Sequence, residues 1–455
     1  MKSKQNLNKY RKKTLALTIP VFFELLVSSL FGMVDMMMVG NSGLPSVSTP
    51  SIAATGITNQ VMFIGIAMAQ AMAVGATTMI SRYIGARQEN KIPNVVKHLI
   101  FLMIIFLIIP FVFFNLLYPK NIMSFIGAEA DTINIGLNYF KIVIIGFSFQ
   151  AINLAIFASM RGSGDTKTPM IINIAVNLLN VFGNYILIFG KFGLPKMGVT
   201  GAGISTTISH LTALVILVFI LISKRHVVKL DLNKGFKFNK PIIQNLIKVG
   251  GPAAIEQVGF RFGVIMFIRI VSGLGTVAYA THQVVSNILS LSFAPGQSFG
   301  IAASTLVGRS LGEKDVNKAN FYIKKTNRLA LLSSIIFAFV FYFFGTTLVS
   351  LYTDDLVIIE TSKNIMKVVA LIQPFQASAF AISGGLRGAG DTISTLIVTI
   401  IGVFIIRIGI AYVLIEILNF GLIGAWVAML SDQIIRWIGI NLRYKTDKWK
   451  YIKLH

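Results

Sequence analysis

The sequence predicts an all-α membrane protein with about twelve transmembrane helices arranged as two six-helix repeats. Three observations support this fold class. The 455 residues are 55% hydrophobic and only 13% charged, with a mean hydropathy of +0.75, whereas soluble domains carry about 25% charged residues. Apolar stretches long enough to cross a bilayer as a helix recur along the whole chain. A charged hexapeptide also occurs twice, as RGSGDT at 161–166 and as RGAGDT at 387–392.

The apolar stretches divide the chain into twelve predicted spans. Several exceed the roughly 20 residues that a bilayer requires, so we expect tilted helices or helices that extend beyond the membrane. Short segments of alternating hydrophobicity, typical of transmembrane barrels, are absent from the sequence. The predicted spans cover residues 14–39, 51–81, 95–118, 132–160, 168–190, 199–223, 241–271, 276–308, 319–345, 358–385, 394–418 and 421–443.

Basic residues mark alternate loops between these spans. The net charge of +24 would suggest a nucleic-acid partner in a soluble protein. In a membrane protein, however, basic residues gather in cytoplasmic loops, so we expect no nucleic acid. Loops 82–97 and 309–328 are basic, whereas 41–50 and 272–276 hold no Lys or Arg. This alternation predicts an even number of spans and cytoplasmic termini.

The repeat extends well beyond the hexapeptide. IPVFFE (19–24) matches GPAAIE (251–256), SRYIGARQENK (81–91) matches GRSLGEKDVNK (308–318), and NYILIFG (184–190) matches AYVLIEI (411–417). The offset is 387 − 161 = 226 for the hexapeptide and stays close to that value elsewhere. Both copies begin on the cytoplasmic side, so they are parallel rather than inverted repeats.

These repeats predict a domain organisation. We expect an N-lobe at 1–222, a basic cytoplasmic linker at 223–240 and a C-lobe at 241–455. Two such lobes would enclose a V-shaped cavity, and rocking one against the other would expose that cavity to each side in turn. Because the two lobes of one chain are expected to be self-sufficient, we expect a monomer surrounded by the lipid bilayer.

Each hexapeptide lies between the fourth and fifth spans of its half. We expect its glycines to adopt positive φ angles and to permit close backbone approach. Asp165 and Asp391 are predicted to cap the next helix, supported by the threonines that follow them. Arg161 and Arg387 are predicted to hydrogen-bond the carbonyls that end the preceding helix. A phosphate-binding role is excluded, because the motif lacks a Walker lysine and follows no strand.

The hexapeptide, in this position of both halves, resembles a motif of the multidrug and toxic compound extrusion (MATE) family. Supporting segments are GMVDMMMVG (32–40), THQVVSNI (281–288) and LVGRSLGEKD (306–315). The resemblance covers essentially the whole chain and is closest to the prokaryotic DinF-like and NorM-like branches. It implies an antiporter that exports organic cations and amphipathic drugs. The implied driving ion is H⁺ or Na⁺, with no other cofactor.

Asp35 is the strongest candidate for the cation-coupling residue. It lies in the middle of the first predicted span, with no Lys or Arg at helical spacing to neutralise it. Ionisable residues within spans are functional candidates by default. Loss of water favours the neutral form of a carboxylate, so Asp35 could bind and release a proton. The resemblance places the coupling aspartate of the N-lobe here; hydrogen bonding between helices is the structural alternative.

Asn177, Asn180 and Asn184 share one face of the fifth span, because they are spaced three and four residues apart. The resemblance implies that this polar cluster faces the aspartate of the first span. Some relatives carry an acid where Asn184 stands. The amide found here disfavours a two-carboxylate Na⁺ site, because hard cations prefer charged oxygen ligands. The asparagines could equally hold neighbouring helices together.

Glu24 and Glu256 occupy equivalent repeat positions, four residues after a proline. Each is expected in the first turns of its helix, where the helix dipole favours a carboxylate. In other branches a functional glutamate lies about one turn further along the seventh span, near Phe260 here, so that proton site is not expected. Methionine and aromatic side chains would suit an adaptable cavity wall. Candidate cavity residues are Glu24, Met37, Gln60, Glu256, Arg261, Gln283, Gln376 and Arg407.

Basic residues at membrane depth keep other functions open. Arg261, Arg269 and Arg407 each need a partner or water, and they are compatible with a flippase of a lipid-linked saccharide. Asp432 and Arg436 are four residues apart and are expected to pair. A channel or scaffold would not require Asp35. We expect no enzyme or metal site, because the histidines form no H-E-x-x-H pattern and the chain has no cysteine.

Overall fold

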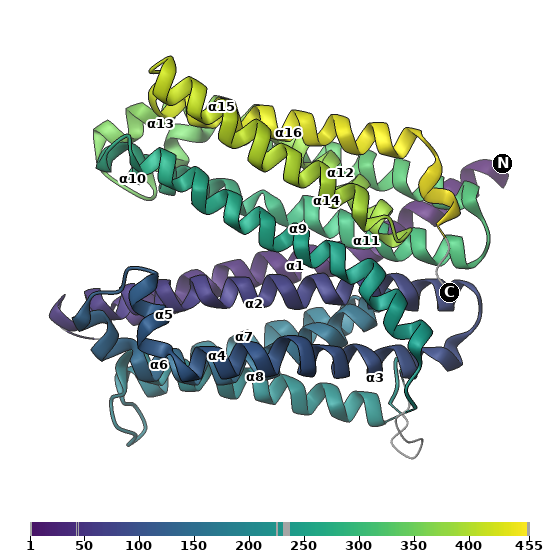
Figure 1. Ribbon diagram of the computed structural model, residues 1–455, viewed down its shortest axis with the longest axis horizontal. Coiled ribbons are helices and arrows are strands. Elements are labelled where there is room, and N and C mark those ends of the chain that lie inside the picture. The colour runs from purple at the N-terminus through teal and green to yellow at the C-terminus, as the bar shows by residue number, and fades with distance from the viewer. Residues whose placement is uncertain (1, 42, 44, 224–225, 231–236, 453–455) are drawn as a thin grey trace. The chain divides into compact units, whose positions relative to one another are not determined.

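A computed structural model describes residues 2–452 except 42, 44, 224–225 and 231–236, and the side chains of 2–9 and 45–48 lie outside that description. The described residues are almost entirely helical and contain no strand (Figure 1). Much of the predicted linker at 223–240 lies outside the described residues. The all-helical fold class predicted from hydropathy is therefore confirmed.

Nine helical segments of the described chain are long and apolar enough to cross a bilayer, judged by length and composition. They coincide with the predicted spans except those at 241–271, 276–308 and 421–443. These three regions are also helical, but charged or polar residues interrupt their apolar character. Glu256 and Arg261 lie in α9 (Lys240–Ser272), and Asp432 and Arg436 lie in α16 (Gly421–Lys445). The region at 276–308 is divided at Ser292 into α10 (Thr276–Leu291) and α11 (Phe293–Gly312).

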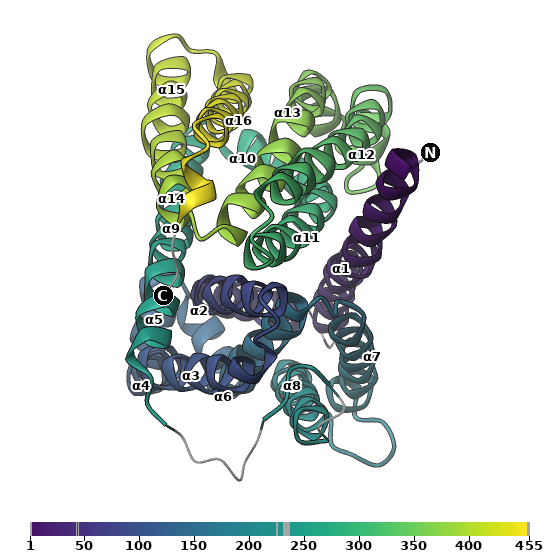
Figure 2. The ribbon, with the colours of Figure 1, turned by 90° about the vertical axis from the view of Figure 1, so that its right-hand side faces the viewer.

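The helices of the first half follow the predicted order. The third predicted span contains a π-helical turn at Ile104–Ile108 and ends before the short helix α5. The helices are α1 (Lys2–Gly40), α2 (Pro45–Gly85), α3 (Ile92–Met103), α4 (Ile109–Leu117), α5 (Pro119–Phe125), α6 (Ala130–Ser163), α7 (Lys167–Phe189) and α8 (Gly198–Ile222). Within this half α8 packs against α6 and α7 (Figure 2).

The second half repeats this order with one irregular helix. After α12 (Val316–Ser350) and α13 (Leu356–Gly388), the chain forms α14 (Thr392–Ile400), a π-helical stretch at Ile401–Arg407, α15 (Ile408–Tyr412) and a second π-helical stretch at Val413–Ile417. A π turn accommodates an extra residue in a helix. The repeat offset rises by one across this region, from 226 at Asp391 to 227 at Ala411. Figure 2 shows α11, α12 and α13 packed together, with α16 against α13.

The chain divides into two compact units. One holds Phe23–Ile80 and the described part of Gln88–Ile247. The other holds the described residues of Met1–Phe22, Ser81–Arg87 and Lys248–His455. The start of α1 and the end of α2 thus pack with the second half of the sequence. The predicted lobe boundaries stay a prediction.

Aromatic and backbone contacts explain why these two short segments join the second unit. The Tyr10 ring lies 5.2 Å from that of Phe321 and 5.6 Å from that of Tyr322. At the end of α2, the Arg82 guanidinium donates to the carbonyl of Ala389 at 2.8 Å. Glycines let α2 and α11 approach closely, because a Cβ on Gly85 would lie 2.0 Å from a carbonyl oxygen of α11.

Candidate polar sites within the helices

Asp35 lies beside two of the three predicted asparagines. The Asn184 amide donates to Asp35 Oδ1 at 2.8 Å. In the amide orientation that satisfies both of its ends, Asn180 donates to both Asp35 oxygens at 3.0 Å and accepts from Thr206 at 3.1 Å. Asn177 does not reach Asp35; its amide donates to the carbonyl of Asn173 at 2.7 Å. The cluster therefore joins α1, α7 and α8 around one carboxylate.

Amides, rather than cations, surround this carboxylate. Among the side chains that the structure describes, no basic group lies within ion-pair distance of Asp35. Both amide partners are buried, with Asn184 0% and Asn180 6% exposed. An ionised carboxylate here is stabilised only by hydrogen bonds, while a protonated one keeps acceptor capacity toward the same amides. The arrangement therefore tolerates both protonation states.

Glu24 and Arg161 form an ion pair between α1 and the end of α6. The Arg161 guanidinium donates to Glu24 Oε1, and the Asn173 amide lies 3.4 Å from the same oxygen. Glu24 is only 2% exposed. The predicted helix-dipole role of Glu24 is wrong, because α1 already begins at residue 2 and Glu24 lies in its interior. The basic N-terminal segment continues the helix far beyond the apolar span.

The second half repeats this pair with Glu256 and Arg387. The Arg387 guanidinium donates to Glu256 Oε1 at 2.6 Å. Thr399 donates to the same oxygen at 3.0 Å, and Thr395 donates to Oε2 at 2.9 Å. Glu256 also lies far inside α9, so the dipole explanation fails here as well. The arginine of each hexapeptide thus binds a buried glutamate, a partner that the predicted carbonyl contacts did not include.

The glycines of the hexapeptide behave as predicted. Gly164 and Gly390 have φ angles of +97° and +85°, which L side chains rarely adopt. Gly162 and Gly388 permit close packing instead. A Cβ on Gly388 would lie 2.2 Å from the Ser304 carbonyl oxygen, and one on Gly162 would lie 3.0 Å from Thr77.

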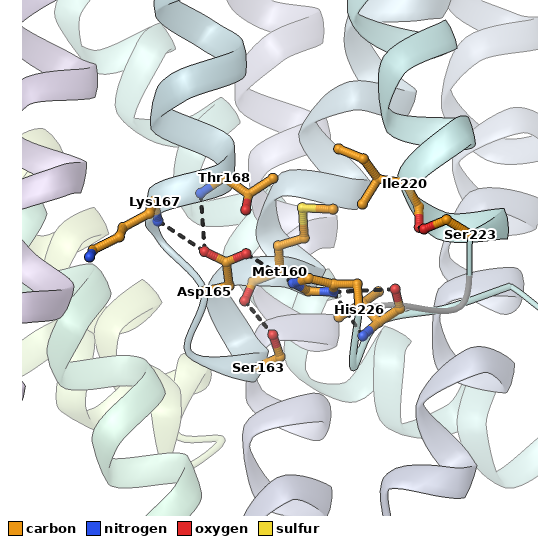
Figure 3. Close-up of polar contacts among 9 residues, drawn as sticks. Met160, Ser163, Asp165, Lys167, Thr168, Ile220, Ser223 and His226 are labelled. Carbon is orange, nitrogen blue, oxygen red and sulfur yellow. Dashed lines mark hydrogen bonds and ion pairs between the residues drawn. The ribbon is translucent and has the colours of Figure 1, made fainter.

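Asp165 caps α7 as predicted and also binds a residue that the sequence did not single out. Its Oδ1 accepts from the backbone N–H groups of Lys167 and Thr168, both at 3.0 Å (Figure 3). His226 Nε2 lies 2.9 Å from Oδ2. Burial alone would raise the pKa of Asp165, but the hydrogen bonds from His226 and Thr168 outweigh it and lower the pKa to about 2.

The cap prediction is wrong for Asp391. Its side chain makes no cap hydrogen bond to α14, and its Oδ2 accepts from Arg443 Nε at 2.6 Å instead. The ion pair with a guanidinium satisfies the carboxylate in place of the helix N–H groups. Thr166 makes no cap hydrogen bond either. In each half, therefore, the hexapeptide aspartate binds a basic side chain that lies near or just beyond the end of the sixth span of that half.

A second buried charged cluster lies on α16 and the π-helical stretch before α15. Asp432 is 0% exposed and accepts from Arg407 Nε at 3.0 Å, and Arg436 Nε lies 3.0 Å from its other oxygen. The predicted pair of Asp432 and Arg436 is present, and Arg407 joins it. Both guanidinium groups also lie over the Phe260 ring, at 5.8 and 5.5 Å. Two cations thus share one anion.

The other predicted cavity residues differ in exposure. Met37 is 65% exposed and Gln60 is exposed, whereas Gln376 is buried. The Gln283 amide donates to the Tyr279 hydroxyl at 2.7 Å, and Arg261 is half-buried. No group of three His, Cys, Asp or Glu in the described residues could hold a metal ion.

Several polar partners of the buried carboxylates were not predicted from the sequence. Asn173 lies four residues before Asn177, on the same face of α7, so the helical spacing could have identified it. Thr395 and Thr399 are also four residues apart and face Glu256. His226 and Arg443 carry no local signal, because their partners are distant in sequence.

Comparison with known proteins identifies the family. The MatE family model matches residues 20–186 and 252–413, one segment in each half. The chain is 32% identical to a probable multidrug resistance protein NorM of Thermotoga maritima, covering 98% of this chain and 95% of the relative. It is also 29% identical to an uncharacterized transporter, YisQ, of Bacillus subtilis, covering 95% of this chain and 94% of the relative.

Solved structures show the same fold. An outward-facing multidrug resistance MATE family transporter of the MOP superfamily aligns with a TM-score of 0.88 and 22% identity, covering 97% of each chain. A crystal structure of MATE in complex with MaD3S aligns with a TM-score of 0.89 and 21% identity over 97% of each chain. The family model covers both halves and the NorM relative spans nearly the full length. The chain therefore belongs to the MATE family of multidrug efflux transporters, which are membrane proteins and not enzymes.

Proposed function

We propose that this transporter is an H⁺-coupled antiporter that exports organic cations and amphipathic drugs by alternating access. The observation that carries the proposal is the environment of Asp35, a carboxylate on an apolar helix that is held by the amides of Asn180 and Asn184 and by no cation among the described side chains. Ionisable residues at such depth mark ion and substrate pathways.

The ligand set favours a proton over Na⁺. Among the described residues, Asp35 is the one carboxylate of its cluster, and the side chain beside it, Asn184, is an amide. A hard metal cation gains most from several charged or carbonyl oxygens. A proton needs only a single carboxylate whose neighbours can hydrogen-bond both its ionised and its protonated form. The amides supply such neighbours, because each can donate through nitrogen or accept through oxygen.

Competition for one carboxylate would couple the two fluxes. An ionised Asp35 attracts an organic cation, and protonation removes that attraction and releases it. Occupancy by proton and by substrate is then mutually exclusive, which is what antiport requires. We further propose that the basic loops and both termini are cytoplasmic, in a bacterial or archaeal inner membrane. The hexapeptide ends of α6 and α13 would then face the cytoplasm.

The test is substrate-triggered proton movement in proteoliposomes. We expect a quaternary ammonium dye to collapse an imposed pH gradient with the wild-type protein and not with Asp35→Asn. Asp131→Asn is a matched control, because it makes the same isosteric change at an exposed position at the start of α6. Transport driven by a Na⁺ gradient alone would overturn proton coupling. Failure of both gradients to move any organic cation would overturn the export proposal.

A further inference from the structure

A column of polar side chains connects Glu24 to Asp35 along α1 and α7. Ser28 Oγ donates to Asn173 Oδ1 at 3.0 Å, and the Asn173 amide reaches Glu24 at 3.4 Å. Asn177 donates to Asn173, one turn further along α7. Asn180 and Asn184 then continue the same face of α7 to Asp35. Each turn of α7 between the two carboxylates therefore presents an amide on this face.

Glu24, at the end of this column, has an unused acceptor. Its Oε1 accepts from Arg161 and Asn173, whereas Oε2 is buried and has no hydrogen-bond partner among the described residues. A buried oxygen left without a donor is unfavourable, and more so on a charged group. A purely structural ion pair would gain from satisfying both oxygens. Glu24 is thus a charged acceptor that remains available at the column's end.

The second half provides an internal comparison, because it repeats the ion pair without the column. Both oxygens of Glu256 are satisfied, by Arg387, Thr399 and Thr395. With the α1-to-α9 offset of 256 − 24 = 232, Phe260 stands where Ser28 stands and Phe267 where Asp35 stands. Two apolar residues, Val403 and Phe404, occupy the turn that matches Asn177. The fold therefore requires the glutamate–arginine pair, but not the polar column.

We propose that Glu24 is the proton-exit residue between Asp35 and the side of the membrane that holds the hexapeptide loops. This inference rests on the proposed proton coupling at Asp35. The two carboxylates are 35 − 24 = 11 residues apart on one helix, or about 16 Å at 1.5 Å per residue. Direct transfer is impossible over that distance, so water molecules hydrogen-bonded to Ser28 and to the α7 amides would relay the proton.

The proton balance of the relay is simple. Asp35 gives up its O–H proton and becomes ionised, the water chain passes one proton along, and Glu24 Oε2 takes it up. Glu24 then returns the proton to solvent water at the hexapeptide end. Arg161 faces Glu24 from α6 and stabilises its ionised form after release, while Asn173 faces it from α7. The buried Oε2 is the atom at which the proton binds in this step.

The test separates proton movement from substrate movement. In proteoliposomes, transport of a quaternary ammonium dye is driven either by a pH gradient or by exchange against the same dye at equal pH. We expect Glu24→Gln to slow gradient-driven transport at least tenfold more than exchange. Glu256→Gln is the matched control, because it alters the repeat-equivalent ion pair, and it should leave the ratio of the two rates unchanged.

A second pair of variants guards against a folding defect in Glu24→Gln. Asn173→Val removes an amide of the column and leaves the Glu24–Arg161 pair, and Thr399→Val is its repeat-equivalent control. Asn173→Val should lower the ratio of the gradient-driven rate to the exchange rate, and Thr399→Val should not. Equal loss of both rates in Glu24→Gln and Asn173→Val, or no loss in either, would overturn the relay while wild-type coupling stood. Absence of proton coupling in the wild type would overturn the proposed function and the relay together.

Discussion

Replacement of Asp432 by Asn should destabilise the protein far more than replacement of either arginine that it binds. Asp432 is 0% exposed, and the side chains of Arg407 and Arg436 are 4% and 16% exposed. Asp432→Asn would leave two guanidinium groups facing each other without an anion. Arg407→Met would instead leave one cation and one anion, with the Arg436–Asp432 contact at 3.0 Å intact.

The expected magnitudes follow from burial. Removing one partner of a buried ion pair costs about 3–5 kcal/mol, because the remaining charge stays desolvated. For Asp432→Asn we expect at least that range, or roughly a hundredfold to several thousandfold change in the unfolding equilibrium at about 1.4 kcal/mol per factor of ten. For Arg407→Met we expect about 1–3 kcal/mol, from hydrogen bonds to a charged group and from the lost contact with Phe260.

Thermal inactivation of purified protein would measure this order. Because membrane proteins commonly unfold irreversibly, the half-life at a fixed temperature is the appropriate quantity. We expect the half-life of Asp432→Asn to be shorter than that of Arg407→Met by tenfold or more. Replacement of all three residues by apolar ones of similar volume should recover much of the loss. Equal half-lives for the two single variants would refute the reasoning, because they would mean that the charges are not effectively desolvated.

Two further predictions concern the hexapeptide loops. Gly388→Ala should lower the thermal stability more than Gly164→Ala, because the new Cβ at 388 would lie 2.2 Å from the Ser304 carbonyl oxygen. At Gly164 only the φ of +97° opposes a side chain, and this backbone strain costs about 1–2 kcal/mol. Comparable melting temperatures for the two variants would contradict this. The pKa of Asp165 is lowered to about 2 from an ordinary value of 3.8, so its hydrogen bonds stabilise the fold above pH 4 and are lost as the pH falls toward 2. The stability difference between wild type and Asp165→Asn, followed by thermal unfolding from pH 5 to 2, should therefore shrink with falling pH, and a constant difference would show that Asp165 does not titrate as argued.

Contacts within one helix face were accessible from the sequence, and contacts between distant helices were not. The spacing of Asn180 and Asn184 placed them on one side of α7, and the structure brings that side to Asp35. The i, i+4 spacing likewise predicted Arg436 beside Asp432. Arg407 is 25 residues from Asp432, and no periodicity relates the two. Their pairing depends on how α16 packs against the π-helical stretch before α15.

The hexapeptide arginines were predicted to contact only the helix that they end, although their true partners lie on another helix. Glu24 with Arg161 and Glu256 with Arg387 recur together at equivalent repeat positions, which indicates a shared structural requirement. Each glutamate was assigned to the first turns of its helix because it lies four residues after a proline. Both helices begin many residues before that proline, so the glutamates lie in helix interiors. Ion pairing between helices then becomes their main stabilisation.

The comparison of the two halves separates framework from chemistry. Both halves keep the glutamate–arginine pair, the close glycine packing and the positive-φ glycine of the hexapeptide. They differ where α1 meets α7 and where α9 meets the helix that follows α14. With the offset of 227 that holds beyond the π-helical stretch, Arg407 stands where Asn180 stands, and it lies 5.7 Å from the ring of Phe267, the counterpart of Asp35.

Duplication alone would have left the same contact in both halves. A carboxylate with an amide in one half, and an aromatic ring with a guanidinium in the other, preserve the meeting point of the two helices but reverse its electrostatic character. A cation would be attracted to the first and repelled by the second. This asymmetry requires no difference in the framework, and it is the physical reason for seeking the coupling ion along α1 and α7 rather than along α9.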